Sequence, residues 1–114
     1  VYVSQYAFDT YYNGTEKYIG LNLMLKENER IILTEGKVEL DEGIMLLPCH
    51  ENIRKFDLGS FGLTVKRGRE YFPDDFRHEQ YLLIEESGKQ ILFSGCSHKG
   101  ILNIAEWFGT FALW

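Results

Sequence analysis

Short apolar runs separated by turn residues are the feature of this sequence that most restricts its fold. Residues 37–40 and 44–47 are two such runs on either side of Asp41-Glu42-Gly43, and residues 30–34 precede them across Glu35-Gly36. Runs of this length are too short for a typical helix but suit strands that end at turns. The pattern therefore predicts antiparallel strands joined by short connections.

The segments on either side of these runs follow the same pattern. We expect strands at residues 18–25 and 62–66 and an irregular segment at residues 49–57. Residues 71–76 are predicted to form a loop, in which Asp75 can cap a short turn. Polar and turn-forming residues separate the predicted strands throughout, as in a β meander.

The period of the apolar residues changes near the end of the chain. Residues 81–85 and 90–94 form the clearest predicted hairpin, with a connection at residues 86–89. After Gly100, apolar residues recur at the spacing of one helix face, namely Ile101, Ile104, Ala105 and Phe108. The sequence thus predicts a single α/β domain over residues 1–114, mainly an antiparallel β meander with a C-terminal helix packed on it.

Composition excludes several classes of partner. The 114 residues include 17 acidic and 12 basic side chains, which give a net charge of -5 without a basic cluster typical of nucleic-acid binders. The longest apolar runs are far too short to span a bilayer. Two cysteines do not make a disulfide framework, and no leader opens the chain. We therefore expect a cytoplasmic protein that binds neither nucleic acid nor membrane.

His98 is the strongest candidate for chemistry. It lies between Gly95 and Gly100, in the predicted turn from the last strand to the helix. Such turns lie at a sheet edge, where open α/β folds place ligands. The positive end of the helix dipole disfavours the imidazolium, and the neutral imidazole is the form that binds metal. The alternative is that His98 only packs against the helix or caps it.

Other candidate residues have weaker support. Cys49 and His50 could join Cys96 and His98 in a zinc site, although adjacent ligands are unusual in structural zinc sites. Cys96 is more readily interpreted as a small buried hydrophobic residue, because no base is identifiable beside it. We interpret His78 as a surface residue.

Carboxylates and amides near these histidines could support a site. Asp74, Asp75 and Glu79 could act in acid–base chemistry, or they could organise a loop. We favour a structural role for Glu79 and keep Asp75 as a site-rim residue. We interpret Asn103, on the first turn of the helix, as a support residue that hydrogen-bonds back to the turn of His98. The alternative is an exposed helix residue.

Two blocks of sequence resemble a known family. Residues 74–80 read Asp-Asp-Phe-Arg-His-Glu-Gln, and residues 91–104 contain Gly-Cys-Ser-His-Lys-Gly-Ile-Leu-Asn. They resemble the metallo-β-lactamase superfamily, in the branch of dihydropterin-ribofuranosylaminobenzene phosphate synthase-like proteins. Its pattern is Asp-x-Phe-x-x-Glu-Gln, a hairpin, then Gly-Cys-[Ser/Ala]-His-x-Gly-Ile-x-Asn. Lys17-Tyr18-Ile19-Gly20 is also similar, and the confident match covers residues 73–104.

The resemblance implies a fold, a cofactor and a role for His98. The implied fold is an αββα sandwich that holds one or two metal ions, usually zinc and alternatively iron or manganese. Such metals activate water for attack on a small-molecule phosphoester or related ester. The family's histidine at the position of His98 is a metal ligand, and Asp75, Ser97 and Asn103 are candidates for the site rim or its support.

The sequence departs from the family in one important respect. The superfamily's His-x-His-x-Asp-His segment is absent, and the other histidines are His50 and His78. Residues 108–114 do not match the family's continuation either. A catalytic zinc needs about three protein ligands. We therefore expect the middle part of a larger domain, inactive alone. The alternative is a non-catalytic β-rich binding or self-assembly module, whose exposed strand faces would favour a homodimer.

Overall fold

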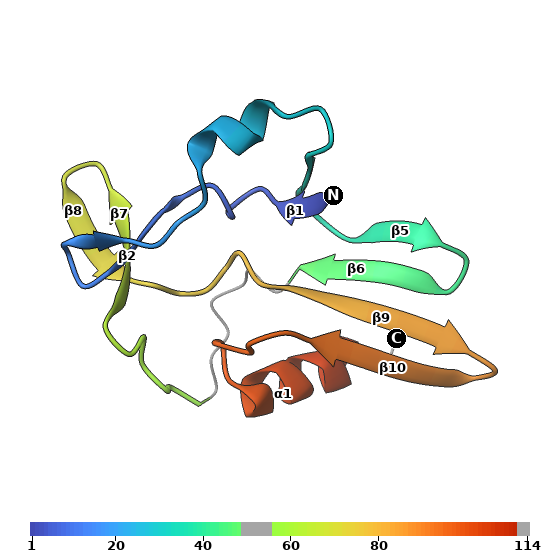
Figure 1. Ribbon diagram of the computed structural model, residues 1–114. Coiled ribbons are helices and arrows are strands. Elements are labelled where there is room, and N and C mark those ends of the chain that lie inside the picture. Colours follow the sequence, from blue (N-terminus) through green and yellow to red (C-terminus); the bar gives the residue numbers. More distant parts are fainter. Residues whose placement is uncertain (49–55, 112–114) are drawn as a thin grey trace.

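The computed structural model describes residues 1–48 and 56–111, which form ten strands, one 3-10 helix and one α-helix (Figure 1). The strands are β1 (Tyr2–Ser4), β2 (Thr10–Asn13), β3 (Lys17–Tyr18), β4 (Ile32–Thr34), β5 (Val38–Asp41), β6 (Ile44–Pro48), β7 (Leu63–Arg67), β8 (Glu70–Pro73), β9 (Gln80–Glu86) and β10 (Lys89–Ser94). The helices are η1 (Leu23–Glu27) and α1 (Ile101–Phe111). No helix within these residues is long and apolar enough to span a membrane.

The strands form two four-stranded antiparallel sheets and one short parallel pair. The first sheet has the order β10-β9-β6-β5 and the second has the order β3-β2-β7-β8. Strands β1 and β4 pair in parallel. The predicted α/β fold with mainly antiparallel strands and a C-terminal helix is therefore confirmed. It is not a simple meander, because β7 and β8 join the second sheet before the chain returns to the first.

The β9–β10 hairpin is the most regular part of the fold. Its six paired positions end at Glu86 and Lys89, so only Ser87 and Gly88 form the turn. Both turn residues have positive φ, 53° and 74°, as a type I′ turn requires. The predicted hairpin is confirmed. Its connection has two residues instead of the four predicted, because Glu86 and Lys89 pair with each other.

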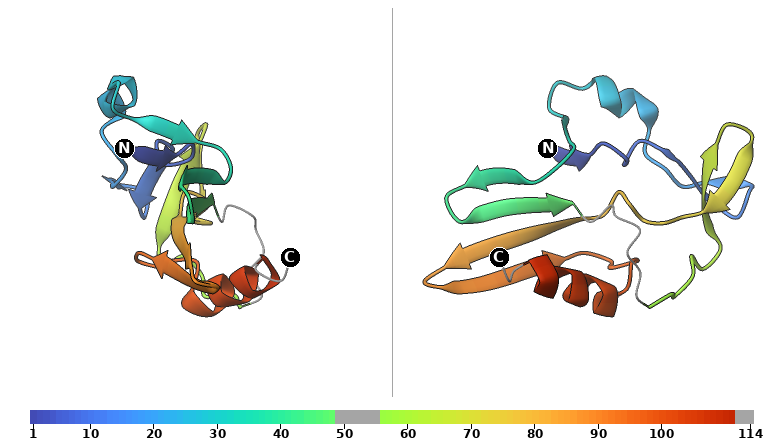
Figure 2. Two further views of the ribbon diagram at one scale, coloured as in Figure 1. Left: turned by 90° about the vertical axis from the view of Figure 1, so that its right-hand side faces the viewer. Right: turned by 180° about the vertical axis from the view of Figure 1, so that it is seen from behind.

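Helix α1 packs on one face of this hairpin, as the view from behind in Figure 2 shows. Ile104 and Tyr81 are each 1% exposed, and Trp107 and Leu92 pack against them. The predicted helix face was partly wrong, because Ile101 is 61% exposed. Asn103, which is buried, occupies the inward position instead, and its hydrogen bonds set the rotation of the helix.

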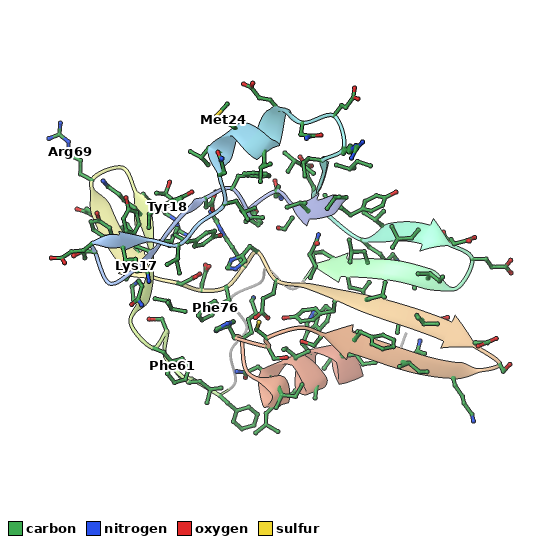
Figure 3. All side chains as sticks on the ribbon, viewed as in Figure 1. Lys17, Tyr18, Met24, Phe61, Arg69 and Phe76 are labelled. Atoms are coloured by element: carbon green, nitrogen blue, oxygen red, sulfur yellow. The ribbon has the colours of Figure 1, made fainter. Side chains whose placement is uncertain are left out.

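Two predicted segments were wrong. Residues 18–25 do not form one strand, since β3 ends at Tyr18 and η1 follows. The Asn22 side chain accepts a hydrogen bond from the Met24 amide at 3.0 Å, which caps η1 and competes with strand pairing. Met24 points away from the sheets (Figure 3). Residues 71–73, expected as part of a loop, belong to β8 (Glu70–Pro73), which pairs with β7.

The described chain is thin and open. It measures 48 × 37 × 18 Å and has a radius of gyration of 15.2 Å, compared with about 14 Å or less for a compact domain of this length. The largest fully buried side chains are Tyr81, Phe76, Leu47, Leu83, Ile104 and Val65. Apolar side chains on β10 and α1, including Phe93 and Leu102, remain more than half exposed.

Candidate functional site

His98 lies in a turn whose backbone demands unusual conformations. The turn joins the end of β10 to the start of α1, and within it Ser97 and Gly100 have φ values of 58° and 94°. A Cβ atom on Gly100 would lie 2.5 Å from Cδ1 of Leu58. Glycine is therefore favoured at position 100 mainly for its conformation, since the flexible side chain of Leu58 can move away from an added Cβ. The turn leaves the side chain of His98 exposed.

The backbone of this turn is bound by Glu79, which directly precedes β9. Oε1 of Glu79 accepts hydrogen bonds from the amides of His98 at 2.5 Å and Lys99 at 3.4 Å. Oε2 accepts a hydrogen bond from the hydroxyl of Tyr81 at 2.6 Å. The structural role favoured for Glu79 is therefore present, and the structure it supports is the turn of His98.

The ring of His98 stacks on Phe76. The two ring centroids are 5.0 Å apart and the planes are inclined by 25°. Phe76 is 2% exposed and lies between the two four-stranded sheets (Figure 3). Its own φ is 55°, a left-handed conformation that is strained for a bulky residue and is often found at functional sites. The imidazole of His98 thus has a fixed apolar partner on one face.

Two hollows meet at His98 and Leu63. One, of about 280 Å³, is lined by Ala7, Tyr11, Ile19, Gly20, Leu21, Leu63, Asp74, Phe76, His78 and His98. The other, of about 590 Å³, is lined by Leu58, Phe61, Leu63, Cys96, Ser97, His98, Gly100 and Ile101. Each combines mostly apolar walls with a few polar groups, as small-molecule sites commonly do. Neither lining set contains a lysine or an arginine.

His78 was predicted to be a surface residue, and this was wrong. It is half-buried, and its ring lies 4.5 Å from that of Tyr11. Its Nδ1 is buried and has no hydrogen-bond partner within residues 1–48 and 56–111. Burial lowers the pKa of His78 below the ordinary 6.5, and the charge of His98 acts in the same direction. Asp74, Glu79 and Asp75 oppose the shift, so the neutral form of His78 prevails because of desolvation.

Because the pKa of His78 is lowered in the folded chain, the stability of the fold should depend on pH. Below pH 6.5 the unfolded chain binds a proton at His78 before the folded chain does, so stability is lost as the pH falls from 6.5 toward the folded pKa. Between about pH 7.5 and 5.5, the free energy of unfolding measured in urea should fall more for the native chain than for His78→Gln. The extra loss should be up to about 1.4 kcal/mol for each unit by which the pKa of His78 differs between the folded and unfolded chain. Equal losses in the two proteins would contradict this.

The predicted rim and support residues lie in different surroundings. Asp75 contacts neither hollow; its carboxylate accepts a hydrogen bond from the Arg77 amide at 3.3 Å and lies 3.9 Å from the guanidinium of Arg67. The neighbouring Asp74, which is 4% exposed, lines the smaller hollow instead. Asp75 thus caps the loop, and the rim role predicted for it receives no support from its position.

Ser97 and Asn103 both belong to the turn of His98. Ser97 lines the larger hollow, and its hydroxyl lies 2.7 Å from that of Ser94. Asn103 donates to the carbonyl of Lys99 at 2.7 Å, so the predicted hydrogen bond back to the turn is present. It also donates to the carbonyl of Phe56 at 2.7 Å and accepts from the Phe56 amide at 2.8 Å. The function of either residue in a reaction stays a prediction.

Cys96 was expected to be buried, but it is exposed and lines the larger hollow. It lies two residues beyond the end of β10, where the chain leaves the sheet. Cys49 and His50, the other members of the alternative zinc site, lie outside the described residues.

The described residues do not fit a catalytic metal by themselves. Across residues 1–48 and 56–111, no group of three or more His, Cys, Asp or Glu side chains is placed to hold a metal ion. A catalytic zinc typically takes three protein ligands. His98 therefore has the exposure and the fixed orientation that a ligand needs, without enough neighbours to complete a site.

Comparison with known proteins gives a match for the fold but none for the sequence. The sequence matches no known family description and no curated protein. The fold is similar to that of Tm1679, a metal-dependent hydrolase of the β-lactamase superfamily, with a TM-score of 0.78 and 26% sequence identity over 96% of this chain. The chain therefore has a partial β-lactamase fold. The chain spans 43% of the length of Tm1679, so this partial β-lactamase fold corresponds to less than half of that protein.

Proposed function

We propose that these 114 residues are the middle part of a metal-dependent hydrolase of the metallo-β-lactamase superfamily, and that His98 is one of its metal ligands. The observation that carries the proposal is the similarity to Tm1679, which extends over 96% of the chain. The exposed imidazole of His98, at the junction of two hollows, supports the assignment of the ligand. The remaining ligands would come from parts of the protein outside these residues.

The proposed reaction is hydrolysis of a phosphoester or a related ester of a small molecule. Zinc, iron or manganese would activate water and polarise the bond that is cleaved. Because neither hollow is lined by a lysine or an arginine, the described residues offer no cationic side chain there for a phosphate. The apolar walls, including Leu58, Phe61 and Leu63, instead suit an uncharged part of the substrate.

The dihydropterin-ribofuranosylaminobenzene phosphate synthase-like branch is the proposed place within the superfamily. It rests on the Asp74–Gln80 block and the Gly95–Asn103 block, which resemble the pattern of that branch. The two blocks meet in space, because Glu79 of the first binds the amide of His98 in the second. This contact gives the two parts of the pattern a shared physical role.

The experiment that tests the proposed function uses the full-length protein that contains these residues. Metal content after gel filtration and hydrolysis of bis-p-nitrophenyl phosphate and p-nitrophenyl acetate would be measured before and after treatment with a chelator. We expect bound metal, hydrolysis of at least one ester, and loss of that activity on chelation. A full-length protein without metal or hydrolytic activity would refute the proposal.

Self-assembly remains the second candidate, and exposed apolar side chains favour it. Ile91 and Phe93 on β10 are 54% and 51% exposed, and Ile101 and Leu102 on α1 are 61% and 62% exposed. In the hydrolase proposal the rest of the larger domain covers these side chains. In the alternative a second copy of the chain covers them. A full-length protein that is inactive and free of metal would favour the alternative.

A further inference from the structure

The carboxylate of Glu79 links the protein core to the turn of His98. One oxygen accepts from two successive amides of the turn, those of His98 and Lys99, and the other accepts from the hydroxyl of Tyr81. We propose that Glu79 is a positioning residue, whose carboxylate fixes the backbone of this turn so that the His98 ring is oriented whether or not a metal is bound. The inference rests on the proposed function for the role of His98 as a ligand.

The surroundings of Glu79 suit this role. The two amides lie just before the start of α1, where the partial positive charge of a helix N-terminus attracts a carboxylate. Hydrogen bonds from backbone amides to a carboxylate are stronger than those to a neutral acceptor. Tyr81 is 1% exposed and packs in the core with Ile104, and its ring lies 5.6 Å from that of Trp107. Its hydroxyl therefore presents Glu79 with a donor that has little freedom to move.

The ring of His98 is oriented by the same segment of chain. Phe76 stacks on the imidazole, and the carbonyl of Phe76 accepts a hydrogen bond from the amide of Glu79 at 3.1 Å. The position of the stacking ring and the position of the carboxylate are thus coupled through one short turn. Consequently, the backbone and the side chain of His98 are both held by residues 76–79.

Two further hydrogen bonds restrain the far side of the turn. Asn103 donates to the carbonyl of Lys99, and the amide of Gly100 donates to the carbonyl of Ser97 at 2.9 Å. These contacts restrain residues 97–100 but do not reach the amide of His98. Within the described residues, Glu79 is the side chain that binds this amide. Its loss should therefore release His98 more than it disturbs the rest of the turn.

The test is an NMR comparison of the full-length protein that contains these residues, after any bound metal has been removed with a chelator. The variants are Glu79→Ala, Glu79→Gln and Tyr81→Phe, and Glu86→Gln is the matched control because Glu86 is an exposed carboxylate at the far end of β9 from Glu79. Glutamine retains one acceptor oxygen for the amide of His98 and an amide group that can donate to the hydroxyl of Tyr81. It therefore tests whether geometry, rather than charge alone, is what Glu79 supplies.

We expect Glu79→Ala to speed hydrogen exchange of the His98 amide by about tenfold or more and to shift the ring signals of His98 that report stacking on Phe76. Glu79→Gln should restore most of the native ring signals, Tyr81→Phe should give an intermediate change, and Glu86→Gln should give none. A folded Glu79→Ala with native His98 signals would overturn the inference. If Glu79→Ala does not fold, native His98 signals in Tyr81→Phe would overturn it.

The NMR readout also separates this inference from the proposed function. If His98 responds as expected but the full-length protein binds no metal, the positioning role stands and the hydrolase proposal fails. If the full-length protein is a metal-dependent hydrolase but His98 is indifferent to Glu79→Ala, the positioning role fails alone.

Discussion

Replacing His98 by alanine in the full-length protein should remove at least one bound metal and reduce ester hydrolysis by more than about 100-fold. Loss of a residue that only supports a metal ligand typically costs 10–100-fold in affinity or activity, and loss of the ligand itself should cost more. Because the side chain of His98 is exposed, the free energy of unfolding should fall by only about 1 kcal/mol or less. Metal content and kcat/KM measure the effect.

His78 provides the matched control for this substitution. It lines the smaller hollow together with His98, but the proposal gives it no bond to metal. His78→Gln should therefore retain the native metal content. If His98→Ala retains its metal and His78→Gln loses it, the ligand has been assigned to the wrong histidine.

Replacing Phe76 by alanine should lower the free energy of unfolding by about 3–5 kcal/mol. Phe76 is 2% exposed, so its removal leaves a cavity between the two sheets and takes away the ring on which His98 stacks. Urea denaturation followed by circular dichroism measures the loss. Phe76→Leu retains most of the volume and should lose much less, which keeps the prediction measurable if the alanine variant does not fold.

Phe93 is the matched control for the stability measurement. It is a phenylalanine on β10 that is 51% exposed, so Phe93→Ala should cost about 1 kcal/mol or less. Equal losses for Phe76→Ala and Phe93→Ala would contradict the central position of Phe76. The difference between the two variants thus isolates the effect of burial.

The parts of the fold that sequence predicts best are those with local causes. The β9–β10 hairpin follows from two apolar runs and from Ser87-Gly88, whose conformation suits a tight turn. The prediction of a strand at residues 18–25 was wrong, because the periodicity of a segment does not show whether another strand is available to pair with it. Strand β3 consists of Lys17 and Tyr18, which pair with β2, and the Asn22 cap then favours a 3-10 helix.

The buried face of α1 was predicted in part wrongly for a different reason. Apolar spacing placed Ile101 on the buried face, but the structure buries Asn103, because its amide bonds the Lys99 carbonyl and both backbone groups of Phe56. Three hydrogen bonds from one side chain outweigh the burial of one apolar residue. Two of the three bonds join Asn103 to Phe56, 47 residues away, and periodicity cannot reveal them.

The candidate site was predicted in part. His98 could be singled out because glycines flank it in a strand-to-helix turn. The contacts of Glu79, Phe76 and His78 could not be predicted, since each depends on how two separate blocks of sequence meet. The available signal was the co-occurrence of both blocks in one family pattern, which indicated proximity without identifying a hydrogen bond.

The contact between Glu79 and His98 also bears on the order in which the chain folds. It closes a loop that contains little more than the β9–β10 hairpin, so the entropy lost on closure is small. By contrast, pairing of β2 with β7 brings together residues about 50 positions apart. Contacts that are near in sequence generally form faster than distant ones. The surroundings of His98 can therefore assemble as a local unit before the second sheet is complete.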